Sequence, residues 1–378
     1  MKYYIIAGEA SGDLHGSNLI REMKKLNPAI SVRCWGGDKM QAAGGELVKH
    51  YRELAFMGFT EVLMNLRTIF RNLAFCKEDI TQYQPDALIL IDYPGFNLRI
   101  AKWAKQQGLK VIYYISPQVW AWKEGRVRMM KECIDKMIVI LPFEKDYFKN
   151  KWNWEVEYVG HPLVDVVASQ QSGPDSYQGG SRKQEFSDRP IVALLPGSRK
   201  QEILKKLPVM LETSRSFPGY QFIVAKAPGL DESFYDELLR PFENVSYVSG
   251  QTYELLMQAE AAIVTSGTAT LETALFGVPE VVCYKGSPIS YQIAKRVIKV
   301  KYISLVNLIM DRLVVKELIQ DALTPENLKT ELEELLHNEK RRAQLKSDYA
   351  ELKSKLSQQG SASARAAKSI VEFISGAN

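Results

Sequence analysis

Short apolar runs alternate with longer segments of helical periodicity along most of the chain. In the first half, such runs occupy residues 3–7, 31–35, 87–91, 111–115, 137–140 and 157–159. A short, continuous apolar run is typical of a strand buried on both faces, and its alternation with helices is typical of a parallel sheet. We therefore predict a doubly wound parallel α/β sheet for this half of the chain.

The alternation starts again after a break in composition. Residues 168–189 are rich in Ser, Gln, Gly, Pro and charged side chains, which is typical of a linker or an exposed loop. A second series of strands is predicted at residues 191–195, 221–224, 245–248, 261–264 and 280–283, and helices follow from Thr324 almost to the end. We predict two Rossmann-like domains facing a cleft, the first from residues 1–167 and about 358–378, the second from residues 190–357.

Residues 59–73 depart from the alternation and show the pattern of an amphipathic helix. Apolar side chains recur on one face at a spacing of 3.6 residues, among them Val62, Leu63, Leu66, Ile69 and Phe70. One interpretation is a helix that buries this face on the sheet. The other is an apolar surface that meets lipid, with its arginines reaching phosphate headgroups.

Composition narrows the classes of protein that this chain can belong to. The chain has 378 residues, 46% hydrophobic and 25% charged, and its net charge of +5 is scattered, so bulk nucleic-acid binding is not indicated. Four distant cysteines without metal-ligand spacing indicate free thiols in a reducing compartment. The chain opens directly with a strand, and no apolar run approaches the ~18 residues that span a bilayer. We expect a cytoplasmic protein whose membrane contact, if any, is peripheral.

The strand predicted at residues 261–264 leads into a turn of small polar residues. Ser266, Gly267 and Thr268 stand before a run of helix formers that contains Glu272. Backbone N–H groups and the helix dipole at such a turn attract an anion, and Glu272 could accept hydrogen bonds from hydroxyl groups beside it. A phosphate next to a polyol describes a nucleotide sugar. An ordinary strand-to-helix connection capped by Ser and Thr explains the pattern equally well.

A second strand of the same half, at residues 191–195, ends in Pro-Gly-Ser followed by Arg199. Ligands of open α/β sheets collect beyond the carboxyl ends of the strands, which is where Arg199 is placed. Its guanidinium could bind a diphosphate and neutralise the charge on a departing nucleoside diphosphate. The alternative is a salt bridge to a neighbouring carboxylate.

Two strand ends of the first half carry further candidate chemistry. Asp92 follows the strand at residues 87–91, where it could be a general base or a helix cap. Trp120 and Trp122 follow the strand at residues 111–115, where they could line an apolar or sugar-binding wall or pack under the next helix.

Several absences exclude other chemistry. The glycine-rich loop at residues 8–13 lacks the dinucleotide spacing Gly-x-Gly-x-x-Gly, although its glycines permit close approach to a ligand. The sequence contains no Asp-x-Asp and no His or Cys pair with ligand spacing. We therefore expect no metal and no cofactor.

Taken together, the motifs resemble one family closely, the lipid-A-disaccharide synthases of Gram-negative bacteria. The resemblance rests on blocks in the family's order: GEASGD at residues 8–13, MG at 57–58 with EVL at 61–63, IDYP at 91–94 with FN at 96–97, SP at 116–117 with VWAW at 119–122, LPFE at 141–144, GH at 160–161, LPGSR at 195–199, SGTA at 266–269 with LE at 271–272, and SL at 304–305 with NL at 307–308.

The resemblance implies a two-domain glycosyltransferase of the GT-B type whose last helix returns to the first domain. It implies metal-independent, inverting transfer from UDP-2,3-diacylglucosamine to 2,3-diacylglucosamine 1-phosphate, which forms a β-1,6 bond and releases UDP. Asp92 would deprotonate the acceptor's 6-hydroxyl and Arg199 would hold the UDP phosphates. The other donor contacts would be Ser266, Gly267, Thr268, Glu272 and Asn307, the last in a role that the resemblance leaves open. The acceptor side of the cleft would contain Glu9, Ser11, Gly12, Asp13, Trp120 and Trp122.

Acyl chains on both substrates favour a membrane-facing role for residues 59–73, at the cytoplasmic face of the inner membrane. Gly95 stands where the family commonly has a second Asp, and Val306 stands where a Pro is usual. Two other classes fit part of the pattern: another UDP-sugar enzyme of the GT-B type, either a non-hydrolysing epimerase or a transferase with a soluble acceptor, and a non-catalytic nucleotide-sugar sensor. The oligomeric state is left open by the sequence.

Overall fold

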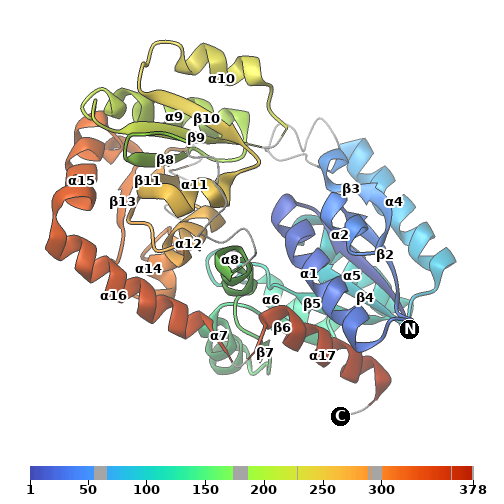
Figure 1. Cartoon of the computed structure of the whole chain (residues 1–378). Coiled ribbons are helices and arrows are strands. Elements are labelled where there is room, and N and C mark those ends of the chain that lie inside the picture. Colours follow the sequence, from blue (N-terminus) through green and yellow to red (C-terminus); the bar gives the residue numbers. More distant parts are fainter. Residues whose placement is uncertain are drawn as a thin grey trace. The chain divides into compact units, whose positions relative to one another are not determined.

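The computed structural model describes residues 1–54, 66–172, 186–227, 229–287, 291, 300–358 and 360–376 (Figure 1). The chain divides into two compact units. Unit 1 comprises Met1–Pro162 and Ser357–Asn378, and unit 2 comprises Leu163–Leu356. In the part of the chain that is described, no helix combines the length and apolar character needed to cross a bilayer.

Unit 1 is built on a seven-stranded parallel sheet in the order β3-β2-β1-β4-β5-β6-β7 (Figure 1). Its strands are β1 (Lys2–Ala7), β2 (Ser31–Gly36), β3 (Glu46–His50), β4 (Ala87–Ile91), β5 (Lys110–Tyr114), β6 (Lys136–Val139) and β7 (Glu157–Tyr158). Its helical segments are α1 (Ala10–Leu26), α2 (Asp38–Ala42), η1 (Tyr51–Glu53), α4 (Leu66–Tyr83), α5 (Pro94–Gln106), α6 (Arg126–Cys133), α7 (Pro142–Trp152) and α17 (Ala362–Ser375). Helices α2 and α17 pack on α1, and α5 packs on α4 and α6.

Unit 2 repeats the architecture with a six-stranded parallel sheet in the order β10-β9-β8-β11-β12-β13. Its strands are β8 (Ile191–Leu195), β9 (Gln221–Lys226), β10 (Val245–Ser249), β11 (Ala259–Thr265), β12 (Glu280–Tyr284) and β13 (Lys316–Ile319). Its helical segments are α8 (Pro162–Ser172), which begins at the unit boundary, α9 (Lys200–Ser214), α10 (Glu232–Leu239), α11 (Thr252–Gln258), α12 (Thr268–Leu275), α14 (Leu305–Met310), η2 (Gln320–Ala322), α15 (Pro325–His337) and α16 (Glu339–Leu356).

The central strands form because their side chains can be buried on both faces. All five residues of β4 and of β8 are buried, as the continuous apolar runs predicted. Each fully buried Leu, Ile or Val contributes about 1.5–3 kcal/mol through removal from water. The predicted pair of doubly wound parallel sheets is therefore confirmed.

The last helix belongs to unit 1, as predicted. It begins shortly after Gly360, whose φ is +80°, and α17 packs along α1. The ring of Phe373 lies under two ammonium groups, 5.8 Å from Lys110 Nζ and 5.4 Å from Lys136 Nζ. The chain thus returns to the unit in which it began.

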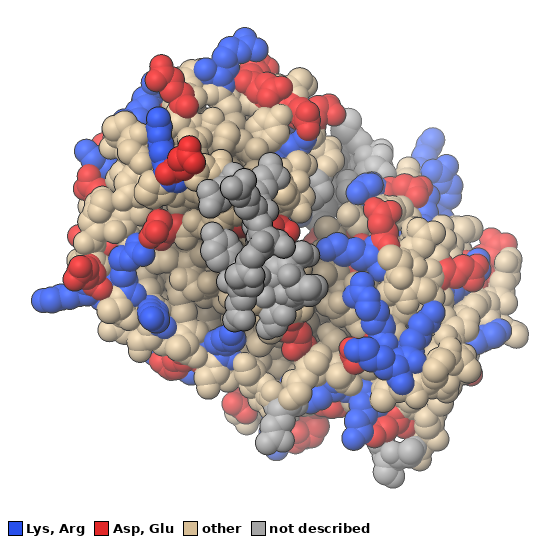
Figure 2. Space-filling view, in the orientation of Figure 1, with Lys and Arg blue, Asp and Glu red and all other residues tan. Residues whose placement is uncertain are grey.

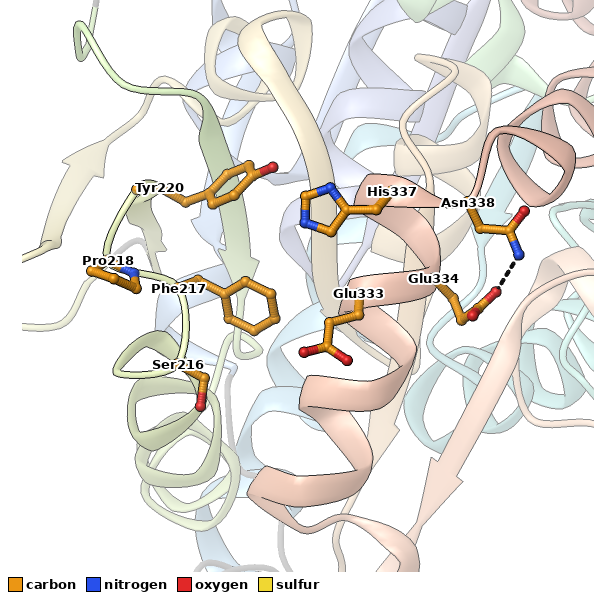
Figure 3. Close-up of a pocket in the computed structure, with 9 residues that line it drawn as sticks. Ser216, Phe217, Pro218, Tyr220, Glu333, Glu334, His337 and Asn338 are labelled. Atoms are coloured by element: carbon orange, nitrogen blue, oxygen red, sulfur yellow. Dashed lines mark hydrogen bonds between the residues drawn. The ribbon is translucent and has the colours of Figure 1, made fainter.

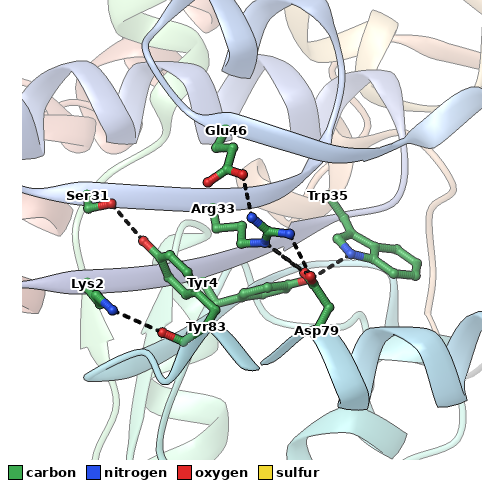
Figure 4. Close-up of polar contacts among 8 residues, drawn as sticks. All are labelled: Lys2, Tyr4, Ser31, Arg33, Trp35, Glu46, Asp79 and Tyr83. Atoms are coloured by element: carbon green, nitrogen blue, oxygen red, sulfur yellow. Dashed lines mark hydrogen bonds and ion pairs between the residues drawn. The ribbon is translucent and has the colours of Figure 1, made fainter. Parts of the chain in front are cut away.

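Hydrogen bonds and an ion pair in a buried polar network connect helix α4 to the sheet (Figure 4). The Asp79 carboxylate accepts hydrogen bonds from the Tyr4 hydroxyl at 2.6 Å and from the Arg33 guanidinium at 2.7 Å. The Tyr4 oxygen in turn accepts from Trp35 Nε1 at 2.8 Å. The network therefore holds α4 against strands β1 and β2.

Some predicted segments lie wholly or partly outside the described residues. Val62 and Leu63 lie outside them, and Leu66 is the first residue of α4. Within the predicted linker, α8 continues through Ser172, so residues 168–172 are helical, and residues 173–185 are not described. The charged side chains of both signs are interspersed over the face drawn in Figure 2, in keeping with the small net charge.

Candidate functional site

Unit 2 has a pocket at the carboxyl ends of three adjacent parallel strands, β9, β8 and β11. Its volume is about 220 Å³. The lining residues are Leu195, Gly197, Ser198, Glu202, Ala225, Lys226, Ala227, Thr252, Thr265, Ser266, Gly267, Thr268, Ala269 and Glu272. This is the sheet edge at which open α/β folds bind their ligands. We call this cavity the strand-end pocket.

The turn between β11 and α12 presents backbone groups to the strand-end pocket. Gly267, at φ +156° and ψ −163°, occupies a backbone region that is essentially restricted to glycine. The Ser266 hydroxyl donates a 2.8 Å hydrogen bond to the Ile303 carbonyl, which fixes the turn against the segment before α14. Since α12 begins at Thr268, which lines this pocket, its first N–H groups and its positive dipole end could stabilise an anion bound there.

Arg199 stands beside the strand-end pocket, at the residue that precedes α9. Its Nη1 lies 3.4 Å from Glu202 Oε1, so the structure has the salt bridge that was the alternative to diphosphate binding. The other carboxylate oxygen of Glu202 lies 3.9 Å from the Nζ of Lys206, a buried residue. Desolvation lowers the pKa of Lys206, and Glu202 opposes that effect. About half of the Arg199 side chain is exposed, which leaves it accessible to a ligand.

Glu272 lies on the same wall as the Ser266 turn and is oriented by a tyrosine. The Tyr253 hydroxyl donates a 3.0 Å hydrogen bond to Glu272 Oε1, and the Tyr253 ring packs 5.3 Å from that of Phe276. Burial raises the pKa of Tyr253, and Glu272 raises it further. Tyr253 therefore keeps its proton and holds the carboxylate toward the pocket.

Asn307 is fully buried beneath this region and does not line the strand-end pocket. Its amide nitrogen donates to the Val315 carbonyl and to Glu317 Oε1, at 2.8 and 2.9 Å. Its amide oxygen accepts from the N–H groups of Val314 and Val315. The two donor and two acceptor positions of the amide are all used within the protein. The predicted contact of Asn307 with the UDP-sugar stays a prediction.

Asp92 follows β4 in a backbone conformation that few residues other than glycine adopt. Its φ is +42° and that of Tyr93 is +48°, both in the left-handed region. The Asp92 carbonyl accepts from the Tyr113 hydroxyl at 2.5 Å and from Asn97 Nδ2 at 2.7 Å. Such strained turns persist where their surroundings hold them, and they concentrate at functional sites.

The Asp92 carboxyl group has the electrostatic properties of a base that operates near neutral pH. Burial raises its pKa to about 7, Glu9 contributes to the increase, and the Tyr93 N–H opposes it. The N-cap residue of α5 is Tyr93, and its side chain makes no cap hydrogen bond. A Cβ at Gly95 would meet nothing within 4 Å, so this position has room for the second Asp of the family pattern.

The glycine-rich loop lies against the Asp92 turn, because β1 and β4 are paired with Ala7 opposite Ile91. A Cβ at Gly8 would come within 2.3 Å of the Tyr93 ring, so this contact requires glycine. Glu9 and Ser11 remain partly exposed at the same sheet edge.

Asp13 has a different environment from the rest of that loop. It is buried, and its carboxylate accepts from the N–H groups of Gly37, Lys39 and Met40 at 2.8 to 3.2 Å. It therefore caps α2, and its predicted place on the acceptor side stays a prediction.

The two tryptophans after β5 have different surroundings. Trp120 Nε1 donates a 3.2 Å hydrogen bond to the buried Glu144, and its ring packs edge-on against Phe143 at 4.9 Å. Burial raises the pKa of Glu144 to about 7, against the hydrogen bonds that it accepts. Trp122 is 45% exposed, so of the two only Trp122 offers an open ring face.

A larger concavity of about 590 Å³ lies at the opposite edge of the unit 2 sheet (Figure 3). It is formed by the loop before β9 and the end of α15, with the rings of Tyr220 and His337 edge-on at 6.1 Å. Glu334 accepts a 2.6 Å hydrogen bond from Asn338. The carboxyl ends of the strands, where ligands collect, are not part of it.

Several residues of the site were missed from the sequence. Lys226 ends β9 and lines the strand-end pocket. Arg199 was selected because it is a polar residue at the end of a predicted strand, and the same criterion applies to Lys226. Tyr253, Glu202 and Glu144 act through contacts that only the folded chain brings about. Within the described residues, no group of three or more His, Cys, Asp or Glu side chains could hold a metal ion.

The fold is that of GT-B nucleotide-sugar enzymes. A UDP co-structure of S. aureus MnaA superimposes with a TM-score of 0.72 at 11% identity, over 99% of this chain and 97% of that one. The calicheamicin glycosyltransferase CalG4 superimposes with a TM-score of 0.60 at 16% identity, over 100% and 98%. At such identities the likeness concerns the fold alone.

Sequence comparison gives the particular family. Residues 3–372 match the family described as lipid-A-disaccharide synthetase. Lipid-A-disaccharide synthases of Syntrophus aciditrophicus and Geobacter metallireducens are each 41% identical to the chain, covering 95% and 98% of it and 94% and 96% of their own lengths. The chain belongs to the lipid-A-disaccharide synthase family and is a glycosyltransferase.

Proposed function

We propose that this enzyme transfers 2,3-diacylglucosamine from UDP-2,3-diacylglucosamine to 2,3-diacylglucosamine 1-phosphate. The observation that carries the proposal is Asp92, a strained strand-end carboxyl group whose pKa is raised to about 7. A base with this pKa is half ionised at neutral pH and can take a proton from an alcohol as that alcohol attacks. The family relationship supplies the substrates.

In the proposed reaction, the Asp92 carboxylate removes the proton from the acceptor's 6-hydroxyl. The resulting oxygen forms a bond to the anomeric carbon of the donor sugar while the bond from that carbon to the UDP oxygen breaks. Attack from the face opposite UDP inverts the anomeric configuration and produces the β-1,6 linkage. The proton ends on Asp92, and the electron pair leaves with UDP.

The leaving diphosphate would be stabilised in the strand-end pocket without a metal ion. Arg199 would exchange its 3.4 Å contact with Glu202 for the phosphate oxygens. The first N–H groups of α12 would supply hydrogen bonds, and Glu272 would accept from the ribose hydroxyls. These roles explain why unit 2 gathers cationic and hydrogen-bonding groups at one sheet edge.

The decisive experiment incubates the enzyme with UDP-2,3-diacylglucosamine and the 1-phosphate monosaccharide. We expect a disaccharide 1-phosphate and free UDP in equal amounts. Asp92→Asn should abolish transfer and leave the affinity for UDP unchanged, because the pocket residues belong to unit 2. Substantial transfer by this variant would contradict the assignment of the base. An epimerised UDP-sugar without disaccharide would point to the non-hydrolysing epimerase class.

We further propose peripheral contact with the cytoplasmic face of the inner membrane, through the start of α4 and the preceding segment. Phe70 is 60% exposed on α4, and Ile69 beside it is half-buried. Moving an exposed apolar side chain from water into the boundary between lipid headgroups and acyl chains lowers the free energy.

Vesicle flotation tests this proposal. Phe70→Asp should reduce recovery with phospholipid vesicles several-fold. The matched control, Leu313→Asp, introduces the same charge at a side chain of unit 2 that is 58% exposed, and it should float like the unaltered protein. Equal recovery of both folded variants would exclude α4 as the contact.

A further inference from the structure

The loop between β5 and α6 carries two positive charges near the strand end that bears the base. Lys123 and Arg126 stand at the two ends of one turn, which a 3.0 Å hydrogen bond from the Arg126 N–H to the Lys123 carbonyl closes. Strands β4 and β5 are parallel neighbours, so this turn leaves the same sheet edge as the Asp92 turn. We call residues 123–126 the basic turn.

Within the described residues, no carboxylate neutralises the positive charges of Lys123 and Arg126. Neither Lys123 nor Arg126 has a carboxylate within 4.0 Å in the portion of the chain that is described. The acid inside the turn, Glu124, accepts a 2.8 Å hydrogen bond from the Tyr147 hydroxyl and lies 2.5 Å from Lys151 Nζ. Lys123 Nζ lies 4.1 Å from the centroid of the exposed Trp122 ring, a contact that orients a cation without cancelling its charge.

Arg126 and Asp92 both act on one hydroxyl group. The Tyr113 hydroxyl donates to the Asp92 carbonyl at 2.5 Å. Burial and then Asp92 raise the pKa of Tyr113, and the positive charge of Arg126 opposes this increase. The cation and the base are therefore parts of one local electrostatic environment.

An anionic acceptor needs such cations at this edge. Burial and then the negative charge of Glu9 raise the pKa of Asp92, so this edge disfavours additional negative charge. A phosphate monoester brings about −1.5 to −2 charges at neutral pH. Without nearby cations, the carboxylates of Asp92 and Glu9 would repel the phosphate of the acceptor.

We propose that Lys123 and Arg126 bind the phosphate monoester of the sugar acceptor, an assignment that rests on the proposed transferase function. Arg126 supplies a planar fork of donors that matches two phosphate oxygens, and Lys123 supplies a point charge. The sugar's phosphate is thereby held on the basic turn while its reacting hydroxyl meets Asp92. The two cations are binding residues for the acceptor and take no part in donor binding.

The experiment compares Lys123→Gln, Arg126→Gln and the double variant with the unaltered enzyme. The substrates are the acceptor with its 1-phosphate and the same diacylglucosamine without it. We expect each single change to raise the acceptor KM about tenfold and the double change about a hundredfold, which corresponds to about 1.4 and 2.7 kcal/mol. The KM for the donor and the kcat should stay within twofold.

Selectivity decides between binding and a merely structural role. The double variant should use the phosphate-free acceptor as well as the unaltered enzyme does, because only the phosphate contact is lost. Lys149→Gln is the matched control, since it removes a positive charge from unit 1 at an exposed residue that pairs with Glu155. Unchanged preference for the phosphorylated acceptor in the double variant would overturn the proposal.

Two binding measurements distinguish a sugar phosphate from a lipid headgroup on the basic turn. The first is calorimetric binding of short-chain diacylglucosamine 1-phosphate in the presence of UDP. This measurement tests the basic turn independently of catalysis. If the acceptor binds but no disaccharide forms, only the proposed function fails. Flotation with anionic vesicles tests whether the turn holds lipid headgroups instead. Loss of flotation in the double variant with unchanged acceptor binding would overturn the proposal, and the reverse result would support it.

Discussion

At the scale of single residues, Asp92 combines a cost in stability with a gain in reactivity. A carboxyl group with an ordinary pKa near 3.8 would be ionised throughout the neutral range and would be a weak base. Burial and Glu9 raise the pKa of Asp92 to about 7, which brings its basicity close to the working pH. The same shift means that the folded state holds a proton that the unfolded chain would release.

We expect this pKa to govern the pH dependence of transfer. The rate should decline below pH 7, because protonated Asp92 cannot accept the acceptor's proton, and it should level off above it. The measurement is kcat/KM for the acceptor between pH 5 and 9. An acid limb near pH 4 would show that the carboxyl group is not perturbed in the free enzyme.

Replacement of Asp92 should change stability in a pH-dependent direction. Because the folded pKa lies above the unfolded one, folding takes up a proton between pH 4 and 7, and stability falls as the pH rises through this range. Asp92→Asn removes this penalty, so at pH 8 the variant should be more stable by on the order of 2–4 kcal/mol. Urea unfolding at pH 4.5 and 8 measures it. An equal difference at both pH values would point to altered packing instead.

At the scale of elements, the buried network around Asp79 decides how firmly α4 is held. Asp79→Ala leaves the buried Tyr4 hydroxyl without its acceptor, and it leaves the Arg33 guanidinium with the exposed Glu46 as its remaining carboxylate partner. We expect a loss of about 1–3 kcal/mol in the free energy of unfolding, because the buried Tyr4 hydroxyl loses its hydrogen-bond acceptor. Denaturant unfolding followed by tryptophan fluorescence measures it, because Trp35 donates into the same network. Glu155→Ala, which breaks an exposed pair with Lys149, should cost less than about 1 kcal/mol.

The elements also show how far sequence reasoning reaches. Strands β4 and β8 were predicted with their observed bounds, because central parallel strands need apolar side chains on both faces. Strands β3 and β13 were missed. They lie at sheet edges and read ELVKH and KELI, where one-sided burial permits charged residues that hide the strand pattern.

The same limit applies to the candidate site. Asp92, Arg199 and the Ser266 turn were predicted as candidates because each follows an apolar run, and a polar residue at a strand end is visible in the local sequence. The Tyr253 contact to Glu272 and the Glu144 contact to Trp120 join residues 19 and 24 positions apart, which no local pattern reveals. The salt bridge of Arg199 to Glu202 was left open as an alternative, and it is the contact that the structure has.

At the scale of the whole molecule, the candidate site residues are divided between two units that have separate cores. The residues of the strand-end pocket all belong to unit 2, and Asp92 with the glycine-rich loop belongs to unit 1. Each unit is a parallel sheet with its polar residues at the carboxyl ends of its strands. A ligand that binds one unit should therefore stabilise that unit through its own contacts.

UDP alone tests this division. At a hundred times its Kd, UDP should stabilise unit 2 by about 2.7 kcal/mol, since it binds the folded form and not the unfolded chain. Hydrogen exchange should slow most at residues 195–202, 225–227 and 265–272, and it should remain unchanged in the core strands of unit 1. Mass spectrometry of peptides resolves these segments.

The arginines at the two ends of α9, Arg199 and Arg215, provide a matched pair of variants for this test. Arg199 and Arg215 each pair with a glutamate three residues away, with Glu202 and Glu212 respectively, but only Arg199 stands beside the strand-end pocket. Arg199→Ala should abolish protection by UDP at the concentration that protects the unaltered enzyme, while Arg215→Ala should retain it. Protection of the unit 1 strands by UDP, with none at the strand ends of unit 2, would mean that the nucleotide binds elsewhere and that Arg199 does not bind its phosphates.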